Sequence, residues 1–135
     1  MGKPEGSLTG AQFEIMELVW EAEAGLTVTE VWELIRQKRK VSRTTVLNLV
    51  DRLEKRGWLK RQKVDGAFRY CATTSREQTE ASLASQFVSD YFAGSASDFL
   101  LSLIGARRIS KKELERLKEM LEGQPESKNR KQNRG

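Results

Sequence analysis

Histidine is absent from the 135-residue sequence, and cysteine occurs only once, at Cys71. Without histidine, the chain lacks the most common general base, metal ligand and proton shuttle of proteins. One cysteine forms no intrachain disulfide and no cluster of thiolate ligands. These absences exclude zinc sites, Ser-His-Asp triads and Cys-His nucleophile pairs, and the sequence also has no Gly-rich phosphate loop. We therefore expect a protein that is not an enzyme and binds no metal and no cofactor.

Long apolar runs are also missing. No stretch approaches the roughly 18 consecutive apolar residues of a transmembrane helix, and residues 1–5 have no apolar stretch of a signal peptide. We therefore expect a cytoplasmic protein without a membrane partner. Apolar residues make up 38% of the chain and charged residues 32%, which suits a globular protein with a modest core, and the length of 135 residues fits one domain or one compact domain with an appendage.

The net charge of +5 is distributed unevenly. Residues 1–35 carry one basic and seven acidic side chains, whereas residues 36–69 carry twelve basic and three acidic ones, a net +9 in 34 residues. Such a basic window is typical of a site for a polyanion, because neutralising phosphates releases condensed counterions. A solvated basic face without a ligand is the alternative. An anionic membrane surface is disfavoured because no segment joins a basic face to a bulky apolar one.

Helix starts are indicated by Ser or Thr followed three residues later by Gln or Glu, the spacing of a capping box. The four such pairs are Thr9–Gln12, Thr27–Glu30, Ser75–Gln78 and Ser110–Glu113. Apolar residues at helical spacing follow these pairs and also follow Ser42, up to the stop signal at Gly57. The predicted helices run from Thr9 to about Ala22, from Thr27 through Ile35, from Ser42 to Gly57, from Ser75 through Tyr91, at Asp98–Ile104 and from Ser110 to Gly123.

Between the third and fourth predicted helices the pattern changes to that of a hairpin. Two strand-like segments, Trp58–Val64 and Ala67–Cys71, flank Asp65-Gly66, a strong signal for a two-residue turn. The order helix, helix, helix, hairpin predicts a winged helix-turn-helix, a mainly α fold with a small β-hairpin wing. Helical spacing alone fits a three-helix bundle equally well, and the hairpin favours the winged helix.

The chain is therefore expected to contain a winged helix-turn-helix DNA-binding domain at 8–74, a helical dimerisation domain at 75–123 and a disordered basic tail at 124–135. Three short helices bury little apolar surface by themselves, and small units of this kind usually need a partner. We expect a homodimer. Its predicted contacts are Leu83, Phe87, Tyr91, Phe99, Leu100, Leu103, Ile104, Leu114, Leu117 and Leu121.

The segment from Ser42 to Gly57 carries the candidate DNA-reading face. Its apolar residues share one stripe, which leaves polar side chains on the opposite side to meet base edges. The predicted base contacts are Arg43, Thr44, Thr45 and Asn48. The predicted phosphate contacts are Ser42, Arg52, Lys60, Arg61, Lys63 and Arg69, with the last four on the wing. For each of these residues an ordinary solvated side chain is the alternative. Trp20, Trp32 and Trp58 are expected to pack rather than to stack on bases.

An ordered set of motifs resembles the BlaI/MecI penicillinase-repressor family over about residues 8–122. The motifs are Leu8-Thr9, Ile15-Met16 and Trp20, then Ser42-Arg43-Thr44-Thr45-Val46, then Arg52-Leu53-Glu54-Lys55-Arg56-Gly57, then Phe68-Arg69-Tyr70. The resemblance implies a transcriptional repressor whose third helix reads a palindromic operator in double-stranded DNA through the positions of Arg43, Thr44, Thr45 and Asn48. It also implies C-terminal helices that interlock into a homodimer.

The family also suggests a regulatory protease as a partner, which cuts an Asn-Phe bond in the short helix of the dimer domain. Here that stretch reads Leu101-Ser102-Leu103-Ile104 and has no such bond. Copper-responsive relatives carry a cysteine-rich motif, whereas this chain has Cys71 alone. The alternative to a DNA-binding repressor is a winged-helix module that binds other proteins without specific DNA binding. That alternative would leave the basic window at residues 36–69 unexplained.

Overall fold

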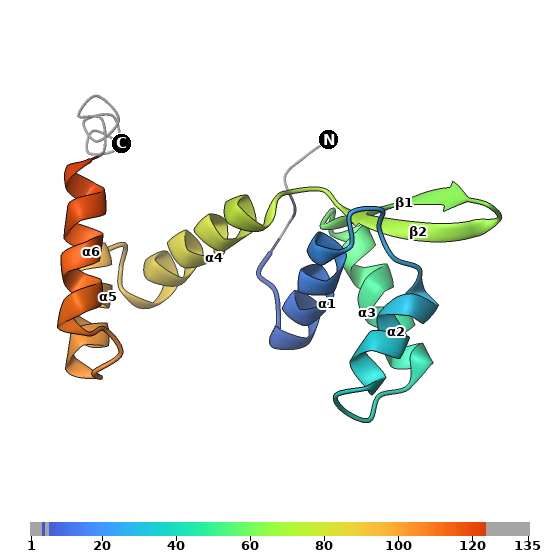
Figure 1. The fold of residues 1–135 in the computed structure, drawn as a ribbon, viewed down its shortest axis with the longest axis horizontal. Coiled ribbons are helices and arrows are strands. Elements are labelled where there is room, and N and C mark those ends of the chain that lie inside the picture. Colours follow the sequence, from blue (N-terminus) through green and yellow to red (C-terminus); the bar gives the residue numbers. More distant parts are fainter. Residues whose placement is uncertain (1–3, 5, 124–135) are drawn as a thin grey trace. The chain divides into compact units, whose positions relative to one another are not determined.

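The structure, a computed structural model, describes residue 4 and residues 6–123 (Figure 1). Helices and strands follow one another in the order predicted from the sequence, which confirms a mainly α fold with a small β-hairpin. The basic tail expected at 124–135 lies outside the described residues. The elements are α1 Gly10–Glu21, α2 Val28–Arg36, α3 Arg43–Lys55, β1 Leu59–Val64, β2 Ala67–Ala72, α4 Arg76–Tyr91, α5 Ala96–Gly105 and α6 Lys111–Glu122.

All four predicted capping boxes are present. At α1 the Gln12 N–H donates to the Thr9 hydroxyl at 3.1 Å, and the Thr9 N–H donates to the Gln12 side chain at 3.0 Å. The same reciprocal pair begins α2, α4 and α6. Ser42 caps α3 by accepting from the Thr45 N–H at 3.1 Å. An N-cap of this kind stabilises a helix by about 1 kcal/mol, so the sequence determines these starts locally.

The hairpin is an antiparallel pair in which Val64 faces Ala67 across the turn. Asp65 and Gly66 both have positive φ, 52° and 82°, as a type I′ turn requires. An isolated bridge between Leu26 and Tyr70 attaches the loop after α1 to β2. Gly25 is needed beside this bridge because its φ is 79° and a Cβ there would lie 2.8 Å from the Tyr70 carbonyl oxygen.

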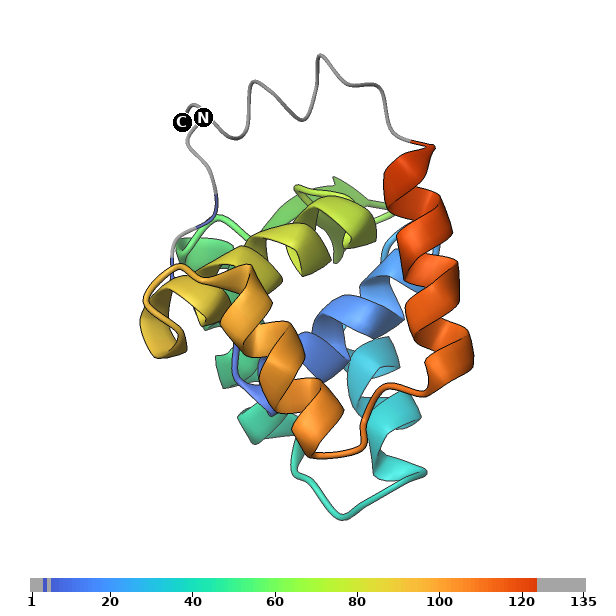
Figure 2. The same ribbon diagram turned by 90° about the vertical axis from the view of Figure 1, so that its left-hand side faces the viewer.

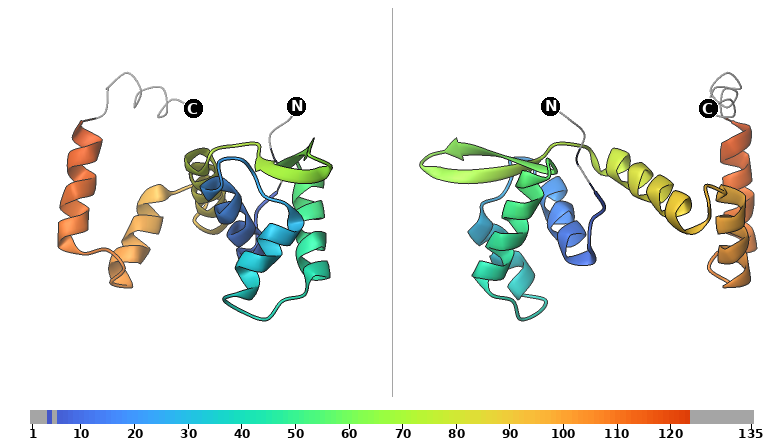
Figure 3. Two further views of the ribbon diagram at one scale, coloured as in Figure 1. Left: turned by 45° about the vertical axis from the view of Figure 1, so that its right-hand side comes forward. Right: turned by 180° about the vertical axis from the view of Figure 1, so that it is seen from behind.

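One hydrophobic core holds the first three helices against the base of the hairpin. Each element contributes residues at its predicted apolar positions, and Figure 3 shows the hairpin extending away from these helices. The buried apolar residues are Ile15, Met16, Val19, Leu26, Val28, Val31, Ile35, Val46, Val50, Leu53, Trp58, Leu59 and Tyr70. Trp20 and Trp32 pack against this core, and all three tryptophans are therefore packing residues, as expected.

The chain divides into two compact units, one up to Phe87 and one from Val88. The sequence placed a boundary at 74/75, but the start of α4 packs with the first unit. The Trp20 indole N–H donates to the Thr74 carbonyl at 2.9 Å, Arg76 pairs with Glu17 at 2.9 Å, and Thr79 is 1% exposed. The winged-helix unit therefore includes the first turns of α4.

The second unit contains the end of α4 together with α5 and α6, two helices joined by a short loop at 106–110 (Figure 2). Phe92 and Phe99 pack with ring centroids 5.3 Å apart. From Val88 to Gly123, however, no described residue is buried. Among the described residues, no helix is both long and apolar enough to cross a membrane.

Candidate nucleic-acid interface

The third helix has two opposite faces. Val46, Val50 and Leu53 are buried in the core, whereas the predicted DNA-facing residues of α3 are all exposed. These exposed residues are Arg43, Thr44, Thr45, Asn48 and Arg52. A helix is about 10–12 Å wide with its side chains, which fits the roughly 12 Å major groove of B-DNA. The structure thus brings the predicted base contacts together on one accessible surface.

The exposed residues of α3 differ in their contacts within the chain. The Arg43 Nε donates to the Thr29 hydroxyl of α2 at 3.0 Å, which draws this side chain toward α2. The Thr45 hydroxyl lies 2.9 Å from the Ser42 hydroxyl, beside the cap. Thr44 and Asn48 make no side-chain hydrogen bond to any other described residue. Their polar groups are therefore available to an external partner at no cost in intrachain bonds.

Leu47 also lies on the exposed side of α3, with 41% of its surface accessible. Sequence reasoning missed it because apolar residues were assigned to the core and polar ones to the groove. The signal was nevertheless present in the spacing. At about 100° per residue, Leu47 is about 40° around the helix from Arg43 and about 60° from Thr44. An apolar side chain therefore belongs to the candidate reading face.

The end of α2 and the loop between α2 and α3 carry a cluster of basic residues. Two arginines of this cluster are paired: Arg36, the last residue of α2, with Glu33 at 2.8 Å, and Arg39 of the loop with Glu14 of α1 at 2.5 Å. The Trp32 indole N–H donates to the Val41 carbonyl at 2.9 Å and fixes the end of the loop. The loop is thus attached to α1 and α2 while its lysines remain exposed.

Strand register sorts the cations of the wing onto two faces. Arg61 faces Tyr70 and Lys63 faces Phe68, so both cations share the side of the hairpin whose base enters the core. There the Arg61 guanidinium pairs with Glu54 of α3 at 3.3 Å and lies 4.3 Å from the Phe68 ring centroid. Lys60 and Arg69 lie on the other side. The four predicted wing contacts therefore do not form one surface.

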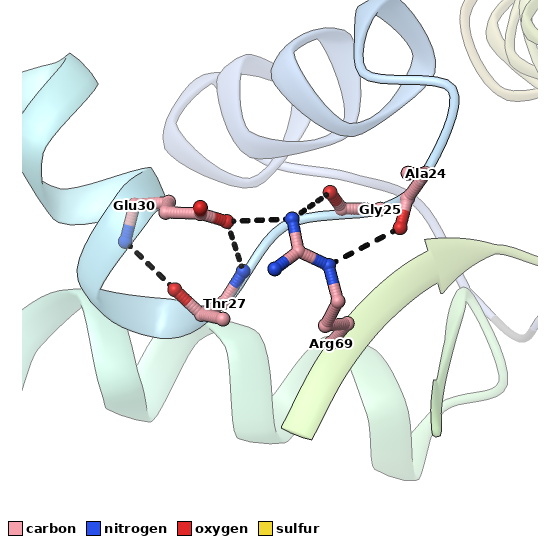
Figure 4. Close-up of polar contacts among 5 residues, drawn as sticks. All are labelled: Ala24, Gly25, Thr27, Glu30 and Arg69. Carbon is pink, nitrogen blue, oxygen red and sulfur yellow. Dashed lines mark hydrogen bonds and ion pairs between the residues drawn. The ribbon is translucent and has the colours of Figure 1, made fainter. Parts of the chain in front are cut away.

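Arg69 is held by the protein itself (Figure 4). Its Nε donates to the Ala24 carbonyl at 3.3 Å, and one terminal nitrogen donates to the Gly25 carbonyl at 3.0 Å and to the Glu30 carboxylate at 3.0 Å. The same carboxylate oxygen accepts the Thr27 N–H of the α2 capping box at 2.9 Å. These contacts connect β2 to the start of the helix-turn-helix. We therefore assign Arg69 to positioning the wing rather than to the phosphate contact expected from the sequence.

The predicted dimerisation residues are poorly covered. Tyr91 and Leu121 are 72% and 64% exposed. Met120 and Leu101, which the expected contact set left out, are also exposed. Neither α5 nor α6 has a buried residue. Within the second unit itself, no described element buries these apolar stripes.

Three helices and an antiparallel hairpin, with an exposed polar face on the third helix, define a winged-helix DNA-binding protein. The model of the family described as penicillinase repressor matches residues 8–123, and the chain therefore belongs to the penicillinase-repressor family. The protein is thus a DNA-binding transcriptional regulator of the repressor type and not an enzyme.

Similar proteins span nearly the whole chain. The methicillin resistance regulatory protein MecI of Mammaliicoccus sciuri is 23% identical over 114 residues, which are 84% of this chain and 92% of the relative. The penicillinase repressor of Staphylococcus aureus is 22% identical over 121 residues, 90% of this chain and 95% of the relative. This chain is also similar to the crystal structure of the S. aureus MepR–DNA complex, with a TM-score of 0.48 and 20% sequence identity. The matched region covers 84% of this chain and 73% of the MepR chain.

Proposed function

We propose that the protein represses transcription as a homodimer that binds a palindromic operator through α3 of each subunit. The observation that carries this proposal is the outward face of α3, where Thr44 and Asn48 are exposed and have no side-chain partner in the described chain. A face that only needs solvent would tolerate any polar residue. Here the residue types match the donor and acceptor patterns of base edges.

The base contacts in this proposal are those predicted from the sequence. Arg43 pairs with the O6 and N7 of a guanine, Asn48 pairs with an adenine, and the methyl groups of Thr44 and Thr45 approach thymine methyl groups. The hydrogen bond from Arg43 to Thr29 would then preorganise the guanidinium before DNA arrives. A side chain ordered in advance loses less entropy on binding.

The phosphate contacts lie on α3 and on the wing. Ser42 caps the Thr45 amide, and the first amides of α3, which have no partner within the helix, suit a phosphate oxygen. Arg52, Lys60, Arg61 and Lys63 supply positive charge. To contact a phosphate, Arg61 has to break its ion pair with Glu54 or bind both groups at once. Breaking the pair costs little, because both side chains are partly exposed and such ion pairs contribute about 0–1 kcal/mol. These contacts set the register of the protein on the duplex without reading sequence.

The second unit supports the homodimer. Its exposed leucines lie on α5 and α6, which bury nothing by themselves, and a second copy supplies a matching apolar surface. Closed two-fold dimers are the commonest protein oligomers. Because a two-fold dimer presents two identical reading helices, the preferred DNA site is an inverted repeat.

Selection of binding sites from random duplex DNA tests the proposal, followed by mobility shifts over a salt series. We expect one enriched inverted repeat and an affinity that falls steeply with salt. Thr44→Ala combined with Asn48→Ala provides the matched control, since both changes are on exposed positions and leave the core intact. Enrichment of no sequence by the native protein would contradict the proposal and favour a winged helix that binds proteins.

A further inference from the structure

Leu47 is the apolar residue that α3 leaves exposed next to its polar reading residues. It is 41% exposed, while Val46 and Val50 beside it are 0% and 1% exposed. Its helical position places it beside Arg43, one turn earlier, and next to Thr44 on the same outward side. Within the described chain, Leu47 belongs neither to the buried core nor to the partly buried apolar residues that pack against it. Its accessible surface is therefore available to an external partner.

We propose that Leu47 reads the 5-methyl group of a thymine in the major groove, as part of the operator recognition proposed above. In the major groove, the thymine methyl is the apolar group that distinguishes one base pair from the others. A leucine placed there gains by removing apolar surface from water. Opposite a cytosine it would instead cover the N4 amino group and leave a donor without a partner, which is costly.

The neighbouring side chains favour this assignment. Arg43 and Asn48 have hydrogen-bonding ends that need guanine or adenine edges, so Leu47 lies between two positions that read polar groups. Arg43 is also hydrogen-bonded to Thr29 on α2, and its position lies about 140° around the helix from Asn48, with Leu47 between them. The proposal therefore makes Leu47 a specificity-determining residue and predicts a thymine beside the base pair that Arg43 contacts.

Replacing single operator thymines with deoxyuridine tests the inference, because this change removes only the methyl group. The enriched operator is prepared with deoxyuridine at each thymine in turn, symmetrically in both half-sites, and dissociation constants are measured by mobility shift. For the native protein we expect, besides the thymines that Thr44 and Thr45 contact, one further thymine position at which the change weakens binding about fourfold per half-site, the value of one buried methyl group. At that position alone, Leu47→Ala should bind the thymine and deoxyuridine operators equally.

Leu34 provides the matched control. It is a leucine of similar exposure, 38%, but it lies on α2, so Leu34→Ala should keep the full difference between thymine and deoxyuridine. The inference is overturned if no thymine in the operator is sensitive to deoxyuridine, or if Leu47→Ala keeps the native sensitivity at every thymine position. Failure of the proposed function gives a different result, since the native protein would then enrich no operator at all.

Discussion

The assignment of Arg69 to wing positioning and Lys63 to phosphate contact makes opposite predictions for two substitutions on the same hairpin. Arg69→Ala removes hydrogen bonds to two carbonyls and an ion pair to Glu30. Hydrogen bonds from a charged donor stabilise by about 1.5–3 kcal/mol when buried. Arg69 is 28% and Glu30 46% exposed, and partly exposed ion pairs contribute about 0–1 kcal/mol. We therefore expect a loss of about 1–3 kcal/mol in the free energy of unfolding.

Two measurements distinguish the roles. Urea unfolding should show the loss for Arg69→Ala, whereas Lys63→Ala should change stability by less than about 0.5 kcal/mol, as exposed substitutions usually do. The logarithmic dependence of DNA affinity on salt should keep its slope in Arg69→Ala, and the slope should decrease by about 0.9 per subunit in Lys63→Ala. Arg69→Ala should weaken binding to every sequence by a similar factor, because a loosened wing carries no base contact.

Glu30→Gln gives a second control, because glutamine keeps a side-chain oxygen for the Thr27 N–H but removes the charge that faces Arg69. In a double-mutant cycle with Arg69→Ala, we expect a coupling of about 0.5–1 kcal/mol. The reasoning is refuted if Arg69→Ala leaves stability unchanged and lowers the salt slope as Lys63→Ala does, since Arg69 would then act on phosphate.

Three further results are expected. Asn48→Ala should weaken operator binding by about 1–3 kcal/mol per half-site and relax preference at one base-pair position in a new selection, and an unchanged preference would count against α3 as the reading helix. Native binding should weaken by about 10³–10⁵ between roughly 50 and 200 mM salt, as for six to ten phosphate contacts, whereas a flat response would rule out a phosphate role for the basic window. In sedimentation, the full protein should have twice the 15.4 kDa mass of one chain, and a fragment ending at Phe87 should be a folded monomer. A full-length protein that is monomeric, or a fragment that still dimerises, would contradict a dimer interface in the second unit.

The fold was predictable where its causes are local. A capping box joins residues three positions apart, so Thr9 and Gln12 determine the start of α1 regardless of the rest of the chain. The turn at Asp65-Gly66 is equally local because both residues adopt positive φ. The buried side of α3 followed from its spacing, and so did the exposure of Thr44 and Asn48.

The partners of individual side chains were less predictable because they depend on distant backbone. Arg69 bonds to carbonyls at Ala24 and Gly25, which lie 45 and 44 residues earlier in the sequence. Every residue carries a carbonyl, so no residue type marks these two as acceptors. The Trp20 bond to Thr74, 54 residues away, likewise placed the start of α4 with the winged-helix unit. Leu47 was missed for another reason. Every apolar residue of this helix was assigned to the core, and therefore no apolar residue could be assigned to the DNA-reading face.

Ion pairing changes how the charge of the basic window should be counted. Three of its arginines pair with carboxylates from outside the window, at Glu14, Glu30 and Glu33, which reduces the +9 of residues 36–69 to +6. Within this fully described window, five basic residues have neither an ion pair nor a hydrogen bond from the side chain: Lys38, Lys40, Arg52, Lys60 and Lys63. The windows of a dimer offer ten such cations, so by themselves they account for a salt slope of up to about 9 in magnitude. If Arg61 or Arg36 also leaves its carboxylate for a phosphate, the window contributes more than this, and Arg61→Ala or Arg36→Ala should then lower the slope.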